Sequence, residues 1–144
     1  MESQFSEDHG HRILSAYAAA VKNKDVGGFM GLYARDVHIY DAWGCFEYEG
    51  SAAWQAMVEG WFGSLGTETV RVDFADIRVC GGPEVAFLSA AATFTAYSGS
   101  GVKLRSLTNR FTMGLSKSAS HWLIAHEHSS LPIEIETGRG IFGS

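Results

Sequence analysis

The sequence has few of the residues that would place it in several common protein classes. It contains only two cysteines, Cys45 and Cys80, which are too few for a disulfide scaffold and are expected to be free, buried thiols. Its eleven Lys and Arg residues are scattered through a chain of net charge −5. It therefore has no basic patch of the kind that binds nucleic acid or an anionic membrane surface. The first residues, MESQFSEDHGHR, are acidic where an export signal is basic and then apolar, which predicts a cytoplasmic protein.

The longest uncharged run also lacks the character of a membrane span. Residues 85–102 carry no charge, but they are rich in Ser, Thr and Gly. Phe94 and several alanines alternate there with Ser89, Thr93 and Thr95, which is typical of a long, half-buried strand. We therefore expect no membrane partner. At 144 residues and 46% hydrophobic content, the chain is long enough to form one domain, over residues 1–144, with its own core.

Hydrophobic periodicity predicts helices in the first half of the chain. Apolar residues recur at helical spacing over residues 5–23, 26–34 and 52–65, and Ser6, Asp25 and Ser51 stand where N-caps are expected. A short strand over residues 37–40 separates the last two helices, and a turn follows at residues 41–44.

The second half of the chain has the alternating pattern of strands. Four long strands are predicted over residues 70–80, 84–97, 102–116 and 121–130. The breaks between them are short enough for hairpins, which indicates an antiparallel meander. Helices followed by strands favour an α+β fold in which a curved sheet covers the helices and encloses a cavity. Residues 133–144 show no pattern and are expected to form a flexible tail or to lie against a partner.

One hairpin, over residues 110–132, concentrates ionisable side chains on one face. With the turn near Ala119, Arg110 pairs with His128 and Thr112 with His126, all on one side of the sheet. A one-residue slip would pair Arg110 with Glu127 instead. The pattern predicts a pocket with a basic wall that points toward the helices and suits an anionic or polar ligand.

Two stretches resemble the NTF2-like superfamily, and within it the SnoaL-like and ketosteroid-isomerase-like proteins. The first is Leu32-Tyr33-Ala34-x-Asp36, followed by Asp41, Gly44, Gly50 and Ala53. The second is the hairpin Arg110-x-Thr112 to Trp122-x-Ile124-x-His126-Glu127-His128-x-Ser130-x-Pro132. The resemblance implies a small cone-shaped α+β barrel with three N-terminal helices and a curved, mainly antiparallel sheet. It also implies a small-molecule pocket without a cofactor, and a homodimer.

The resemblance to steroid isomerases assigns roles to two residues. Asp41 matches the carboxylate base, and Tyr17 matches the tyrosine that binds the oxyanion. Without the resemblance, Asp41 is more simply a turn aspartate, and with it the turn and the catalytic interpretations are equally supported. Tyr17 is more simply a core tyrosine. The protonated acid of such isomerases has no counterpart, because the comparable strand offers Thr112 or Met113. We therefore expect no steroid isomerisation.

The function favoured by the sequence is cofactor-independent acid–base catalysis, of isomerase, cyclase or dehydratase type, on a carbonyl-containing or polycyclic compound. Asp41, Tyr17 and His126 form its catalytic set. The predicted ligand-binding residues are Arg110, Thr112, His128, Trp61 and Tyr33.

The sequence leaves a metal site and a second function open. His126 and His128 form a pair that is common in metal sites, but only His38 is a candidate third ligand, so we expect no metal. The alternative function is a non-catalytic ligand-binding or association module. Such a module would dimerise through the outer face of its sheet, where Glu127 and the apolar side chains Phe94, Phe111, Met113 and Leu123 are expected.

Overall fold

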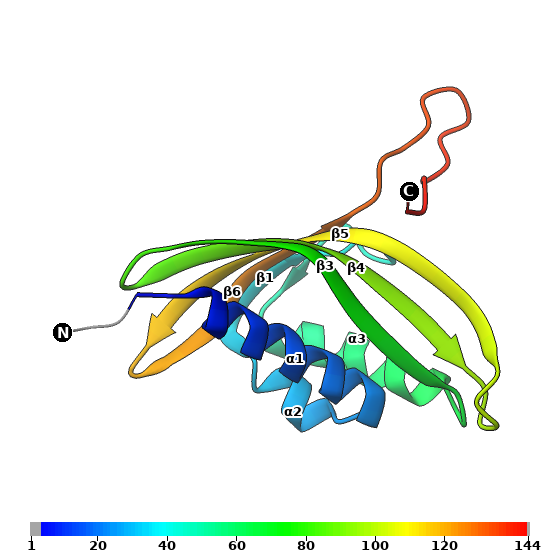
Figure 1. Ribbon diagram of the computed structural model, residues 1–144, viewed down its shortest axis with the longest axis horizontal. Helices are drawn as coiled ribbons and strands as arrows, with labels where there is room; N and C mark the ends of the chain where they lie inside the picture. Colours follow the sequence, from blue (N-terminus) through cyan, green and yellow to red (C-terminus); the bar gives the residue numbers. More distant parts are fainter. Residues whose placement is uncertain (1–3, 144) are drawn as a thin grey trace.

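The computed structural model describes residues 4–143, which contain three helices and six strands. In chain order these are α1 (Glu7–Asn23), α2 (Val26–Met30), β1 (Tyr33–Tyr40), β2 (Tyr48–Glu49), α3 (Ser51–Ser64), β3 (Thr69–Gly81), β4 (Val85–Tyr97), β5 (Lys103–Ser118) and β6 (His121–Ser130). Figure 1 shows the helices packed together against one face of a long, curved sheet. The predicted α+β arrangement is confirmed.

The helix ends follow local sequence chemistry. The Ser6 side chain caps α1 by accepting a hydrogen bond from the His9 N–H, and Asp25 caps α2 by accepting one from the Gly28 N–H at 3.0 Å. The predicted helix over residues 26–34 is too long, because α2 ends at Met30 and β1 begins at Tyr33. The predicted Ser51 cap is also wrong, since the N-cap is Gly50 with φ of 86°, a conformation that favours glycine.

The six strands form one mixed sheet in the order β2-β1-β6-β5-β4-β3. Every neighbouring pair is antiparallel except β1 and β6, which run parallel. The parallel pair joins the first strand of the chain to the last, so it brings the end of β1 beside the end of β6. The sheet curves around the helices without closing into a barrel (Figure 1).

The hairpin of β5 and β6 has a different register from the predicted one. Thr112 pairs with His128 and Arg110 with Ser130, so the predicted partners are displaced by two residues. The ladder also shifts at a β-bulge, because Gly114 pairs with His126 but Leu115 pairs with Ile124. Such a bulge adds one residue to β6 and reverses which residues face the core.

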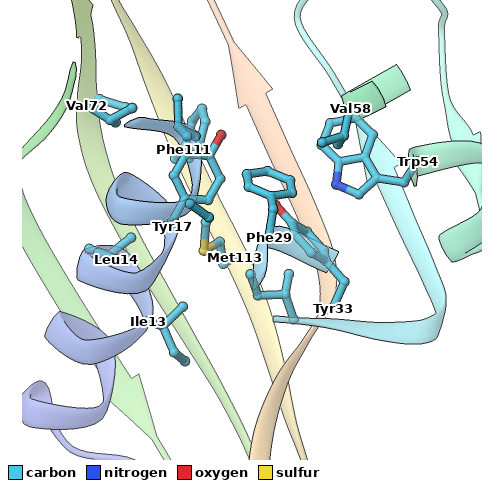
Figure 2. Packing of buried hydrophobic residues seen from close by; sticks show 14 of the residues in the cluster. Ile13, Leu14, Tyr17, Phe29, Tyr33, Trp54, Val58, Val72, Phe111 and Met113 are labelled. Carbon is cyan, nitrogen blue, oxygen red and sulfur yellow. The ribbon is translucent and has the colours of Figure 1, made fainter. Parts of the chain in front are cut away.

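The core fills the space between the helices and the inner face of the sheet. Figure 2 shows Tyr17 and Phe29, whose ring centroids are 4.8 Å apart, packed beside Phe111 and Met113 of β5. Phe111 is 4% exposed and Met113 is fully buried, so the prediction that they cover an outer, dimerising face is wrong. Phe94 is half-buried against the same core. Apolar side chains gain most by burial, so this face of β5 turns toward the helices.

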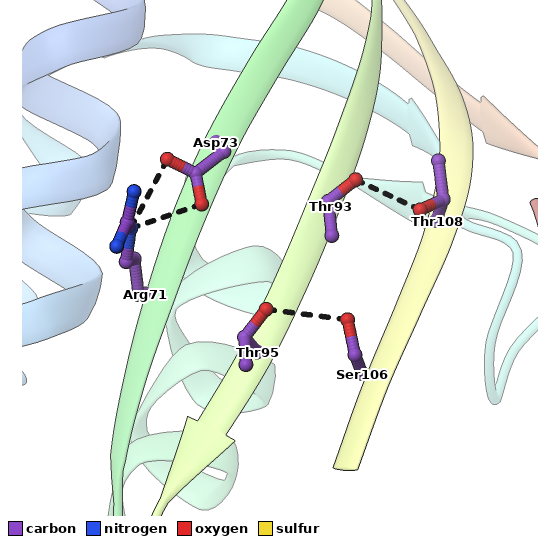
Figure 3. Close-up of polar contacts among 6 residues, drawn as sticks. All are labelled: Arg71, Asp73, Thr93, Thr95, Ser106 and Thr108. Carbon is purple, nitrogen blue, oxygen red and sulfur yellow. Dashed lines mark hydrogen bonds and ion pairs between the residues drawn. The ribbon is translucent and has the colours of Figure 1, made fainter. Parts of the chain in front are cut away.

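The outer face of the sheet carries polar cross-strand pairs. Figure 3 shows the Thr93 and Thr108 hydroxyls of β4 and β5 at 2.8 Å, and those of Thr95 and Ser106 at 3.2 Å. On β3, Arg71 forms an ion pair with Asp73 at 3.0 Å. These pairs are typical of a sheet with one face turned away from the core.

The segment after β6 folds back rather than extending freely. Ile133 and Gly140 form an isolated β-bridge, and the Gly143 N–H donates to the Thr108 carbonyl at 3.1 Å. The Phe142 ring stacks on Trp43, with centroids 5.6 Å apart. The expected flexible tail is therefore a defined loop over residues 133–143.

Two other expectations concern the surface. Cys45 and Cys80 are free, as predicted, but both are exposed rather than buried. Within residues 4–143, no helix combines the length and the apolar character that crossing a bilayer requires.

Candidate functional site

A cavity of about 320 Å³ lies between the helices and the inner face of the sheet. This volume suits a small organic molecule. Its walls come from α1, α3, β4, β5, β6 and the segment after β1, through the residues Tyr17, Asp41, Trp43, Trp54, Met57, Trp61, Phe94, Leu107, Asn109, Phe111 and Glu127. Most of these side chains are apolar or aromatic, so the polar groups among them are held in a poorly hydrated space.

Asp41 follows the last residue of β1, where the parallel pairing with β6 brings it beside Ser129. The Ser129 hydroxyl donates to Asp41 Oδ1 at 2.9 Å and accepts from the Ala42 N–H at 2.9 Å. These bonds fix the carboxyl group in the cavity wall. Burial raises the pKa of Asp41, although the hydrogen bonds from Ser129 and the backbone oppose this effect.

Glu127 is the second carboxyl group of the cavity and is 2% exposed. It lies on β6 just beyond the bulge, opposite Met113. The Tyr33 hydroxyl donates to Glu127 Oε1 at 2.6 Å. Burial raises the pKa of Glu127 to about 8, with a further contribution from the charge of Asp41 and an opposing one from the Tyr33 hydrogen bond. Glu127 is therefore mostly a neutral acid at pH 7.

Two tyrosines face these carboxyl groups. Burial, followed by the charge of Glu127, holds the pKa of both Tyr17 and Tyr33 well above the usual value. Both phenols therefore keep their protons and can donate hydrogen bonds. In Figure 2 the Tyr17 ring extends from α1 toward Phe111 of β5, in the cavity wall.

Two further polar atoms in the cavity wall are buried. Within the described part of the chain, Asn109 Oδ1 and Trp54 Nε1 have no hydrogen-bond partner. The Trp54 N–H lies near enough to the Tyr33 oxygen to lower the pKa of that phenol, but the contact lacks hydrogen-bond geometry. Leaving a buried polar atom unpaired costs about 1–3 kcal/mol, so both atoms are candidates for contact with a ligand.

The predicted site residues divide into two groups. Asp41, Tyr17 and Trp61 line the cavity as the sequence suggests, and Tyr33 reaches it through Glu127.

The second group is the predicted basic wall, which does not exist. Arg110, Thr112, His126 and His128 alternate with the buried residues of β5 and β6 and lie on the outer face. Arg110 is exposed and donates to the Ser130 hydroxyl at 3.2 Å. For the histidines the prediction fails because the bulge in β6 places Ile124 inside and His126 outside, whereas strict alternation would keep them on one face. Arg110 and Thr112 lie outside because the apolar Phe111 and Met113 of the same strand turn toward the core.

The same bulge explains the residue that sequence reasoning missed. Glu127 was expected on the outer face, paired across a dimer surface, but it is the most buried carboxyl group of the cavity. Asn109, also missed, is 3% exposed on β5. Its place among Leu107, Phe111 and Met113, at alternating positions of one strand, is the signal that could have found it.

Comparison with known proteins places the chain in a family. Residues 11–134 match the SnoaL-like domain, and the chain belongs to that family. This confirms the resemblance found in the sequence. No functionally curated protein matches the chain at a significant level.

Solved structures agree on the fold. An NTF2-like protein of unknown function from Pseudomonas putida KT2440 superposes with a TM-score of 0.84 at 23% identity, covering 96% of this chain and 94% of that one. A protein from Xanthomonas campestris, provisionally named a calcium/calmodulin-dependent protein kinase II association domain, has a TM-score of 0.76 at 19% identity and covers 91% of each chain. A protein from Novosphingobium aromaticivorans, provisionally named a scytalone dehydratase, has a TM-score of 0.75 at 12% identity, over 96% of this chain and 94% of that one.

Proposed function

We propose that this protein is a cofactor-independent acid–base enzyme that acts on a carbonyl-containing, mainly apolar compound, by isomerisation, cyclisation or dehydration. The observation that carries the proposal is the burial of Glu127, hydrogen-bonded by Tyr33, in the same apolar cavity as Asp41. Two carboxyl groups held in different environments are the arrangement from which acid and base roles arise.

Asp41 is the base in this proposal. Its hydrogen bond from Ser129 orients the carboxylate, and its raised pKa makes it a better proton acceptor than an exposed aspartate. It would remove a proton from the carbon next to the substrate carbonyl. The electron pair then moves onto the carbonyl oxygen, which becomes an enolate.

Glu127 and Tyr17 are the groups that would stabilise that oxygen. Because Tyr33 donates to Oε1 of Glu127, the acid proton is available on Oε2 for a hydrogen bond to the enolate. The Tyr17 phenol supplies a second neutral donor from the cavity wall. The expectation that steroid isomerisation is absent rested on a missing acid, and Glu127 removes that reason.

The walls restrict the substrate. Trp43, Trp61 and Phe94 offer aromatic surface, which favours a planar or polycyclic compound. The unpaired Asn109 Oδ1 would accept a hydrogen bond from a substrate hydroxyl or N–H group. With Arg110 outside and two carboxyl groups inside, the support for an anionic ligand is lost, and we propose a neutral one.

Proton exchange tests this proposal without knowledge of the natural substrate. A fused-ring cyclic ketone in D₂O should exchange its α-protons faster with the protein, as followed by NMR. Asp41→Asn should slow the catalysed exchange by about 10²–10⁴-fold, and Glu127→Gln by about 10²-fold. Arg110→Ala is the matched control and should change the rate less than about twofold, because its side chain lies on the outer face.

The same experiment distinguishes an enzyme from a non-catalytic ligand-binding module. If the ketone saturates the cavity and no exchange is accelerated, the protein is a binding module. That second function is favoured by the largely apolar lining of the cavity, and one structural neighbour is provisionally named an association domain.

We also propose a homodimer for either function, but the exposed apolar residues that support it differ from those predicted. Of the apolar residues expected outside, Phe111 and Met113 are buried and Phe94 is half-buried against the core, but Phe87 of β4 is 51% exposed on the outer face. A light-scattering mass near 15.6 kDa at micromolar concentration would contradict a dimer, whereas twice that mass is expected.

A further inference from the structure

A cluster of metal-ligand side chains lies on the outer face of β1 and β2, away from the cavity. One ligand atom each from His38, Glu47 and Glu49 falls within 4.8 Å of the other two. His38 is half-buried, and the two glutamates are exposed. One imidazole and two carboxylates form a mixed nitrogen and oxygen set, which suits a divalent transition metal better than Ca²⁺ or Mg²⁺.

Strand pairing brings these residues together. His38 and Glu49 are direct partners in the antiparallel ladder, so their Cβ atoms are about 5 Å apart on one face. Glu47 lies two residues before Glu49, and period-two alternation places both glutamates on that same face. Tyr48, between them, turns inward and packs against Trp54, with ring centroids 5.2 Å apart. The inward anchor of Tyr48 thus holds both glutamates outward.

The distance between His38 and Glu47 fits an ion pair and is also close to the separation of two ligands of one cation. His38 Nε2 and Glu47 Oε1 are 3.5 Å apart, at the outer limit for a hydrogen bond. Two ligands of one tetrahedral Zn²⁺, each about 2.1 Å from the metal, are separated by about 3.4 Å.

The His38 ring is also held in place by its neighbours. Its centroid lies 4.6 Å from that of Tyr40 and 5.4 Å from that of His126. These contacts limit the rotation of the imidazole, so less side-chain freedom is lost when it coordinates a metal.

We propose that His38, Glu47 and Glu49 bind a divalent transition-metal ion, Zn²⁺ by preference, with water completing the coordination. The site is separate from the proposed acid–base chemistry. The ion would join the two-residue strand β2 to β1 and fix both ends of residues 39–46. That segment contains Asp41 and Trp43, two residues of the cavity wall. The ion would therefore restrict the motion of this edge of the pocket.

Metal titration of the untagged protein tests the proposal directly. Co²⁺, added as a spectroscopic substitute for Zn²⁺, should give visible absorption bands of a tetrahedral or five-coordinate site at one equivalent, and Zn²⁺ should remove them. His38→Ala and Glu49→Gln should each weaken binding by at least about 100-fold, since even the loss of a supporting partner costs 10–100-fold. The matched controls His121→Ala and Glu84→Gln change exposed residues outside the cluster and should bind as the unaltered protein does.

A second measurement covers variants that fail to fold. Zn²⁺ should slow amide hydrogen exchange in residues 39–49 of the unaltered protein and leave the β3–β4 hairpin unchanged. Absence of Co²⁺ bands at millimolar metal would overturn the proposal. Equal binding by the unaltered protein, His38→Ala and Glu49→Gln would do the same. Neither result would affect the proton-exchange test of the cavity.

Discussion

Replacement of Glu127 by Gln should change how the stability of the protein depends on pH. In the unfolded chain the carboxyl group has its usual pKa of 4.5, whereas burial raises it to about 8 in the folded protein. Between these values the folded protein holds a proton that the unfolded chain has released. The free energy of unfolding therefore falls with rising pH over this window, by about 1.4 kcal/mol per pH unit. The total decrease in the free energy of unfolding is about 5 kcal/mol, and it is complete once the pH exceeds the pKa of Glu127 in the folded protein.

Gln resembles the neutral acid in shape and cannot ionise. Its carbonyl oxygen can still accept the hydrogen bond that Tyr33 gives to Oε1. At about pH 5 we expect Glu127→Gln and the unaltered protein to be similar in stability. At about pH 8 the variant should be more stable by several kcal/mol, because only the unaltered protein loses stability with pH.

Urea denaturation at a series of pH values measures this difference. Glu59→Gln, an exposed change on α3, is the control and should follow the unaltered protein throughout. If the unaltered protein and Glu127→Gln lose stability with parallel slopes from about pH 5 to pH 8, then Glu127 is ionised in the folded protein and the reasoning is wrong.

Three further predictions concern single side chains. Tyr33→Phe removes a hydrogen bond that lowers the pKa of Glu127, so that pKa should rise further; a carboxyl NMR titration that shows it falling would contradict the assignment. Thr112→Asp places a carboxyl group on the outer face, so α-proton exchange should stay within about twofold of the unaltered rate; a large increase would show that Thr112 faces the cavity. Phe142→Ala removes the ring stacked on Trp43 and should lower the free energy of unfolding by about 1 kcal/mol; urea denaturation measures this change, and a loss above about 3 kcal/mol would mean that the tail contributes to the core.

Much of the fold could be read from the sequence because periodicity reports burial directly. The apolar stripe of α1 and the alternation of β3 to β5 predicted those elements to within one or two residues. The main error among the helices was the predicted helix over residues 26–34. Gly27, Gly28 and Gly31 make this segment a poor helix, and β1 begins at Tyr33 instead.

The candidate site was harder to predict because it depends on which face of each strand turns toward the core. The alternation of side chains shows that a strand has two faces, but not which of them is buried. A bulge leaves no pattern in the side chains that reveals it, yet it exchanges the inner and outer faces of a strand. In β6 this exchange moves His126 and His128 outward and Glu127 inward. Asp41 and Tyr17 were found because the family resemblance pointed to them.

The pairing of β1 with β6 also could not be predicted from the sequence pattern. These strands are parallel and far apart in the chain, and no turn sets their register. Their pairing places Ile39 beside Glu127 and brings Asp41 within reach of Ser129. The juxtaposition of the two carboxyl groups is therefore a property of the folded sheet.

The most direct test of the acid–base site is a ¹³C NMR titration of the Glu127 side-chain carboxyl group in the folded protein. The resonance is assigned by its absence in Glu127→Gln, and Tyr33 and Asp41 are left intact. A midpoint at about 8 is predicted, with the group neutral at pH 7 and able to donate a hydrogen bond to an enolate. A midpoint near the usual 4.5 would mean that the cavity holds two carboxylates and no acid, which contradicts the proposed chemistry.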